Sequence, residues 1–304
     1  MKPNVSITRQ AIKTQVEEVL LRPKIETGWA LYGLIKPNGR IIITNILQPN
    51  DSDIDRQTSK VIIGGEVLAD AYRWLAMNYA FMKRDRGITD SSRLAFLFKG
   101  HSHHTLTTKR HSPDDIASIR EAIEVDHMEV AIGPLATIEL NTLQRILWFL
   151  EPANPKVNLQ YLFLSQAMIN AGNRDPIPIV PNVIDETDVH LVPQLCWRFT
   201  ERDLYEKEIA ELIKHGCKTQ VVYRDIDGKP PLEIQFLVQK PNWAGVVSIV
   251  TAWDYPLSDP VFVVTRIPGR FPRQHILGGD LYPSWSKGDH FIDAIKRLEG
   301  RGAI

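Results

Sequence analysis

The fold is decided by the stretch Leu94-Ala-Phe-Leu-Phe-Lys-Gly-His-Ser-His103, followed after a short loop by Ser112-Pro-Asp-Asp115. The apolar run 94–100 predicts a short, buried strand that ends directly at His101. The second segment places Ser at the N-cap, Pro at the first helical position and Asp in the first turn, which predicts a helix from 112 to about 123. A buried strand leading through a loop into a capped helix is typical of an α/β fold.

The sequence on either side extends this alternation of strands and helices. A Pro37-Asn38-Gly39 turn separates two apolar segments and predicts a hairpin. The other elements expected from periodicity are helices at 6–21 and 64–83 and strands at 26–35, 40–47, 128–132 and 136–140. The first half is therefore expected to be α/β.

The composition changes between 151 and 193, where six prolines occur and only 159–171 has a helical pattern. We therefore expect a first domain at 1–160, a helix and Pro-rich linker at 161–193 and a second domain at 194–304. The second domain is expected to be α+β, with a helix plus an antiparallel meander. Its elements are predicted at 201–215 and 289–298 for helices and at 219–223, 232–239, 245–252 and 261–265 for strands.

Charge and cysteine content exclude several classes of protein. Lys+Arg and Asp+Glu number 36 each in 304 residues, so no overall field favours nucleic acid or an anionic membrane. Two cysteines, Cys196 and Cys217, form neither a disulfide framework nor a CxxC zinc clamp. The first residues lack the apolar core of a signal peptide, and no apolar stretch approaches the length of a membrane span. We expect a cytoplasmic location.

A metal site is indicated at the end of the strand that leads to His101. His101 and His103 are two residues apart, so on a strand both imidazoles reach the same face. Asp115, in the first turn of the next helix, is directed back toward the same loop. Two His and one carboxylate, with water as a fourth ligand, are the composition of a hydrolytic zinc site. Taken separately, an HxH pair is more often two ordinary polar residues, and SxxD is mostly a helix cap.

The combined motif resembles the JAMM/MPN (JAB-type) family of zinc metalloisopeptidases. It consists of Glu26-Thr-Gly-Trp-Ala-Leu-Tyr-Gly33, a helix, Gly100-His-Ser-His103 and Ser112-Pro-Asp-Asp115. The order, the strand and helix contexts and roughly the first 150 residues fit that family. The resemblance implies a cytidine-deaminase-like mixed sheet with flanking helices for this half.

The resemblance also implies a role for each motif residue. His101, His103 and Asp115 are expected to bind Zn²⁺. Glu26 is the expected general base, which takes a proton from the attacking water and passes it to the leaving amine. Ser112 is expected to donate from its hydroxyl to the tetrahedral oxyanion. An isopeptide amine is a poor leaving group that must be protonated, which fits one carboxylate shuttling a proton. Without the motif, Glu26 would be read as a solvated charge before a strand.

One departure from the family pattern lies in the loop. Eight residues rather than seven separate His103 from Ser112, and His104 stands where the family has Pro. Either the loop holds one inserted residue or His104 contributes to the site; we favour the inserted residue, and assign His104 and His111 to the loop surface. Other zinc families fit less well, because the metallo-β-lactamase pattern would need Asp at Thr105, and neither P-C-x-x-C nor H-E-x-x-H occurs.

The second half resembles, more faintly, the fold of ubiquitin-conjugating enzymes. The carrying features are Trp253-Asp-Tyr-Pro-Leu-Ser-Asp-Pro260 after the third strand and Leu281-Tyr-Pro-Ser-Trp285 before a helix. The catalytic Cys expected near Gly279 to Tyr282 is missing, so the resemblance implies a non-catalytic binding module. A generic α+β accessory domain is the alternative reading.

Together these features favour a zinc-dependent (iso)peptidase that cleaves after the C-terminal tail of a ubiquitin-like protein. Its partners would be that protein or its conjugates, and enzymes of the conjugation system. The first alternative is an inactive, metal-free MPN scaffold that binds partners in such a system. The second is a hydrolase of small amides unrelated to ubiquitin.

Overall fold

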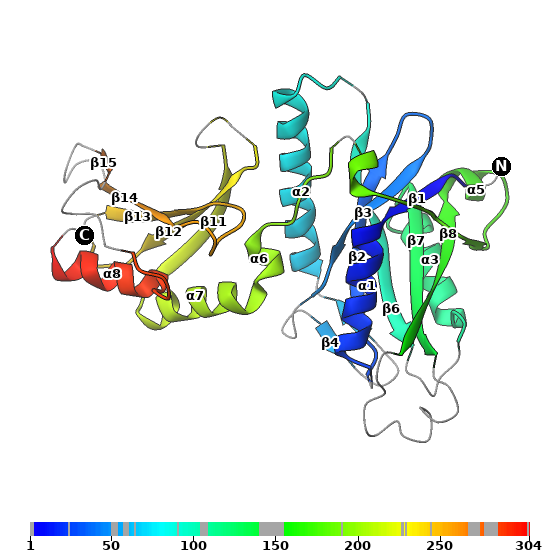
Figure 1. Cartoon of the computed structure of the whole chain (residues 1–304), viewed down its shortest axis with the longest axis horizontal. Helices are drawn as coiled ribbons and strands as arrows, with labels where there is room; N and C mark the ends of the chain where they lie inside the picture. Colours follow the sequence, from blue (N-terminus) through cyan, green and yellow to red (C-terminus); the bar gives the residue numbers. More distant parts are fainter. Residues whose placement is uncertain are drawn as a thin grey trace. The chain divides into compact units, whose positions relative to one another are not determined.

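The chain is described by a computed structural model that covers residues 3–23, 25–49, 54–56, 61–63, 65–89, 91–103, 109–139, 155–189, 191–225, 228, 230–243, 245–266, 274–276, 285–302 and 304. It divides into two compact units (Figure 1). The first comprises Met1–Tyr79 and Ile88–Gln194, and the second comprises Ala80–Gly87 and Leu195–Ile304. Each unit is described by itself.

The first unit is built on an eight-stranded mixed sheet with the order β10-β1-β3-β2-β6-β7-β8-β9. Its parallel pairs are β1 with β3, β1 with β10, and β6 with β7, and the other neighbours are antiparallel. A separate hairpin pairs β4 (Ile54–Arg56) with β5 (Val61–Ile63). The strands of the large sheet are β1 (Val5–Thr8), β2 (Gly28–Ile35), β3 (Ile41–Leu47), β6 (Arg93–His103), β7 (Val130–Glu139), β8 (Lys156–Ser165), β9 (Ile177–Ile179) and β10 (Asn182–Ile184).

The large sheet is curled, so that its two edge strands come close together. β9 pairs with β8 at one edge and β10 pairs with β1 at the other, yet only Val180 and Pro181 separate them. Two residues span at most about 10 Å between their neighbours. The sheet therefore wraps around helix α1 (Arg9–Leu21), whose buried residues share one apolar core with β1, β2, β7 and β8 (Figure 1).

Helices α2 (Gly65–Asp85) and α3 (Pro113–Glu124) cover the face opposite α1. Tyr32 points away from the α1 core, and its hydroxyl donates to the Leu68 carbonyl of α2 at 2.9 Å. Ile119 and Ile123 of α3 form a second core with Ala131 and Leu164 of β7 and β8. Helix α5 (Gln166–Asn170) follows β8 and adds partly buried residues to this core.

A β-bulge in β6 changes which face its side chains reach. Leu31 pairs with Phe98 but Tyr32 pairs with Phe96, so Leu97 is the extra residue, and Phe98 has a φ of 122°. Leu97 packs in the α1 core, whereas Phe98 packs beside α3. A bulge of one residue moves all later side chains to the opposite face. The end of β6 therefore presents its odd-numbered side chains to the face where α3 begins.

Most elements predicted for the first half are confirmed, and three predictions are wrong in part. Residues 5–8 begin as strand β1 rather than helix, because β1 pairs with β3 and Thr8 caps α1. The strands expected at 128–132 and 136–140 are one strand, β7, which runs through Gly133 and Pro134. The helix expected at 159–171 is mostly strand β8, because ten residue pairs with β7 outweigh the helical pattern of this segment. β9, β10 and a short 3₁₀ helix (Glu186–Asp188) follow it.

The second unit is a five-stranded antiparallel sheet with the order β11-β12-β13-β14-β15. Trp197 lies in its aromatic core, in contact with Phe236, Tyr255 and Phe291. The expected helix, four-strand meander and final helix are confirmed within two residues at each end. The elements are α6 (Trp197–Thr200), α7 (Arg202–Lys214), β11 (Lys218–Arg224), β12 (Glu233–Gln239), β13 (Gly245–Thr251), β14 (Val261–Arg266), β15 (Gln274–Ile276) and α8 (Phe291–Gly300).

Glu299 of α8 lies in a polar cluster of the second unit. Its carboxylate accepts hydrogen bonds from His215, Lys240 and Trp243 at 2.6–3.0 Å. Burial alone would raise the pKa of Glu299, but these hydrogen bonds outweigh burial and lower it to about 2. The segment where the resemblance expects a catalytic Cys, 279–282, lies outside the described residues, and Cys196 and Cys217 are buried free thiols.

None of the helices in the described part of the chain has both the length and the apolar character needed to cross a membrane.

Candidate metal centre

His101 and His103 lie at the carboxyl end of β6, on the face where α3 begins. Because of the bulge, both imidazoles are directed away from the α1 core. Gly100, between them and the bulge, faces that core, since a Cβ added there would meet Trp29. β6 leads through α3 to the parallel strand β7. Functional sites in α/β sheets commonly lie at the carboxyl ends of such strands, beside the N-terminus of the following helix.

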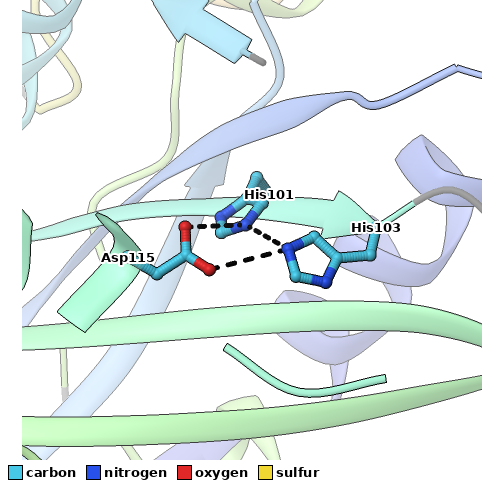
Figure 2. Close-up of side chains that lie close together, drawn as sticks. All are labelled: His101, His103 and Asp115. Atoms are coloured by element: carbon cyan, nitrogen blue, oxygen red, sulfur yellow. Dashed lines mark hydrogen bonds and ion pairs between the residues drawn. The ribbon is translucent and has the colours of Figure 1, made fainter. Parts of the chain in front are cut away.

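Asp115 approaches the two imidazoles from the first turn of α3. Its carboxylate and Ser112 form a capping box: the Ser112 N–H donates to Asp115 Oδ2 at 2.7 Å, and the Asp115 N–H donates to Ser112 Oγ at 3.2 Å. This reciprocal pair holds the carboxylate in one orientation. Figure 2 shows the Asp115 carboxylate facing both imidazole rings.

The three side chains converge at the spacing that a zinc ion requires. His101 Nε2 and His103 Nε2 are 3.2 Å apart, and they lie 3.2 and 3.5 Å from Asp115 Oδ1 and Oδ2. Two ligands at a tetrahedral angle, each about 2.0–2.1 Å from zinc, lie about 3.3 Å apart. Among the described residues, these three form the only group of His, Cys, Asp and Glu arranged to hold a metal ion. The donor set and its geometry fit zinc.

Electrostatics keeps the carboxylate ionised. Burial alone would raise the pKa of Asp115, but hydrogen bonds with His101, His103 and the Ser112 N–H outweigh it and hold the pKa well below its ordinary value. The N-terminus of α3 adds a favourable partial positive charge. The side chains of His103 and Asp115 are 9% and 19% exposed, so the centre is partly shielded from water.

Strand register places Glu26 beside the candidate metal ligands. β2 and β6 are antiparallel, with Gly28 opposite His101. The next pair is Thr27 and Ser102, joined by the hydrogen bond from the Ser102 N–H to the Thr27 carbonyl at 2.8 Å. Continuing this register places Glu26 opposite His103, and opposed residues of an antiparallel pair share a face. Glu26 is 5% exposed, so the reading of a solvated charge is wrong.

Ser112 is at the helix N-cap that the sequence predicts, adjacent to Asp115. Its oxygen accepts the Asp115 N–H, so the hydroxyl proton is directed elsewhere. His111 was expected on the loop surface, but it is half-buried and its Nε2 lies 3.0 Å from the Gly133 carbonyl. Burial lowers the pKa of His111. His104 lies outside the described residues.

Two residues of this region have no signal in the sequence that would have identified them. Thr137 of β7 is in register with His103, is 3% exposed, and its hydroxyl has no hydrogen-bond partner among the described residues. Ser102 lies between His101 and His103 in β6, and its hydroxyl accepts a hydrogen bond from the Thr27 N–H. Both depend on the pairing of β6 with its neighbours, which a strand pattern alone does not specify.

Models of known protein families give no match, and curated protein sequences give none either.

Proposed function

We propose that this protein is a zinc-dependent (iso)peptidase that cleaves after the C-terminal tail of a ubiquitin-like protein. The observation that carries the proposal is the convergence of His101, His103 and Asp115 at zinc spacing, with a buried Glu26 on the same sheet face. The same two-His, one-carboxylate set also occurs in Fe(II) oxygenases. A buried carboxylate beside the ligands favours hydrolysis, because hydrolysis needs a base and an oxygenase does not.

Zinc, when bound by His101, His103 and Asp115, would polarise a carbonyl and lower the pKa of a coordinated water toward about 7. Glu26 accepts the proton of the attacking water and delivers it to the leaving amine. Its burial supports this role, because a shielded carboxylate is a stronger base toward a substrate proton.

Ser112 donates a hydrogen bond to the oxygen on which negative charge develops. Its position supports this role: the hydroxyl accepts the Asp115 N–H, which orients the oxygen and leaves the proton for a substrate. The capping box therefore holds one metal ligand and one hydrogen-bond donor at the same helix N-terminus.

Within this proposal the first unit is a JAMM/MPN domain, and the second is a non-catalytic module resembling ubiquitin-conjugating enzymes. The order of the second unit supports the latter: α7 precedes an antiparallel meander, and Tyr255-Pro256 follows the third strand, β13. Because Cys196 and Cys217 are buried, neither offers an accessible thiol for a thioester. The module would bind a ubiquitin-like protein or an enzyme of the conjugation system.

The test compares the wild type with Glu26→Gln, on fusions of a ubiquitin-like protein and on short peptide amides. We expect one zinc per chain in both proteins and cleavage of the fusion by the wild type alone. Full activity of Glu26→Gln would refute the mechanism. Turnover of short amides without a protein tail would favour a small-amide hydrolase, and a metal-free wild type would favour a scaffold.

A further inference from the structure

The regular hydrogen-bond ladder between β2 and β6 ends just before the proposed base. Its last pair is Gly28 with His101. At the next pair the Ser102 N–H donates to the Thr27 carbonyl at 2.8 Å, as in a normal ladder. The reciprocal bond is different, because the Thr27 N–H donates to the Ser102 hydroxyl at 3.1 Å. A side-chain oxygen thus accepts the hydrogen bond that completes this pair.

The Thr27 side chain is also held on the face of the sheet that α1 covers. Its hydroxyl donates to the carboxylate of Glu18 on α1, and Arg22 donates to both oxygens of the same carboxylate at 3.1 Å. Thr27 is fully buried, and Glu18 and Ser102 are 2% and 3% exposed. Charge-assisted hydrogen bonds in such shielded positions are stronger than neutral ones in water.

The metal ligands have further support besides this arrangement. His101 and His103 are supported by the parallel ladder with β7, where they pair with Leu135 and Thr137. Asp115 is supported by its capping box on α3. Glu26, in contrast, lies two residues before the first residue of β2, Gly28, and its neighbour Thr27 is bonded to Ser102 of β6.

We infer that Ser102 and Thr27 are positioning residues, which together hold the Glu26 carboxylate at a fixed place beside the metal ligands. This role rests on the proposed function and concerns its chemical step, in which Glu26 acts as the base. Because the ligands have this further support from β7 and α3, loss of the Ser102–Thr27 bonds is expected to lower the rate of the chemical step while zinc stays bound.

The experiment compares Ser102→Val with Ser102→Thr, two β-branched side chains of similar volume that differ in the hydroxyl. For Ser102→Val we expect kcat to fall about 10- to 100-fold, with KM within about twofold and one zinc per chain. Ser102→Thr is expected to restore kcat. Independently of activity, amide hydrogen exchange at Thr27 is expected to be about tenfold faster in Ser102→Val than in Ser102→Thr, as for loss of one hydrogen bond.

Equal kcat in the Val and Thr variants would overturn the inference, as would loss of zinc in step with loss of activity. Unchanged exchange at Thr27 would also overturn it. If Ser102→Val does not fold, Thr27→Val against Thr27→Ser decides by kcat, KM and zinc content, because only the former loses the bond to Glu18. Glu26→Gln distinguishes failure of the proposed function from failure of the inference. A fully active Glu26→Gln would refute the mechanism, whereas an inactive Glu26→Gln together with wild-type kcat in Ser102→Val would refute the positioning role alone.

Discussion

Replacing Ser112 with glycine and with alanine separates helix capping from hydrogen-bond donation to a substrate. The Ser112 oxygen caps α3 by accepting the Asp115 N–H at 3.2 Å. Loss of a Ser N-cap costs about 1 kcal/mol when Ala replaces it and only a few tenths when Gly does. In a unit of this size, about 1 kcal/mol corresponds to a fall in Tm of about 2–4 °C. We therefore expect a measurable fall for Ser112→Ala and almost none for Ser112→Gly.

The same two variants are expected to have equal effects on catalysis, because both lack the hydroxyl. Removing one donor to a developing oxyanion lowers kcat by about 100- to 1000-fold. Steady-state kinetics at 25 °C, well below unfolding, measures this effect apart from stability. Ser112→Thr keeps both the cap and the hydroxyl and is the matched control. The zinc content of each variant shows whether Asp115 still binds the metal.

The pattern across the variants decides between the two roles. Equal, large losses of kcat in the Gly and Ala variants, with unequal losses of Tm, would support donation by the hydroxyl. Wild-type kcat in Ser112→Gly would refute that role. A loss of kcat that follows the loss of Tm would mean that Ser112 acts through the helix cap alone.

Three further predictions follow from the structure. A Cβ on Gly100 would lie 2.5 Å from the indole nitrogen of buried Trp29, so Gly100→Ala is expected to lower the free energy of unfolding by about 1–3 kcal/mol in denaturant titrations. Gly65→Ala, with open space at its Cβ, is the control and is expected to have no such effect; equal stabilities of the two variants would contradict the packing. Because the pKa of Glu299 is about 2 in the folded protein against an ordinary value of 4.5, its stabilising effect is present above pH 4.5 and is lost as the pH falls toward 2. Glu299→Gln is expected to lower the free energy of unfolding by on the order of 2 kcal/mol at pH 7 and by progressively less on acidification. A difference in stability between wild type and variant that does not change with pH would exclude this linkage. Removal of zinc by a chelator is expected to lower Tm, since a ligand at 100 times its Kd stabilises by about 2.7 kcal/mol; a chelator effect that persists in His103→Ala would place the metal elsewhere.

The local elements of the site could be predicted because their signals are local. The order Ser112-Pro113-Asp114-Asp115 specifies a helix start, and α3 begins at Pro113 with Ser112 as its N-cap. The apolar run before His101 is likewise found in β6. Two residues of separation on a strand were enough to expect the two imidazoles on one face, and their nitrogens are 3.2 Å apart.

The face of the sheet that carries the site could not be predicted. Simple alternation from Ala95 and Leu97, which pack in the α1 core, would direct His101 and His103 into that core as well. The bulge at Leu97 and Phe98 reverses the alternation, and Phe98 has a positive φ at this point of the pairing between β6 and β2. No Gly or Pro marks the bulge in the sequence.

Long-range strand pairing explains the remaining differences. The segment expected as a helix at 159–171 is strand β8 because β7 pairs with it along its whole length. The region expected as a linker supplies β9 and β10, which lie at opposite edges of the curled sheet. Such pairings are favoured by contacts far apart in the chain, so the Pro-rich composition that suggested a linker did not reveal them.

The most direct test is the metal content of the purified protein, measured by elemental analysis for the wild type, Glu26→Gln and His103→Ala. We expect one zinc per chain in the wild type and in Glu26→Gln, and none in His103→Ala, because His103 is one of three ligands whereas Glu26 serves as the base. A wild type without zinc, a wild type that holds iron instead, or zinc retained in full by His103→Ala would contradict a zinc centre at His101, His103 and Asp115.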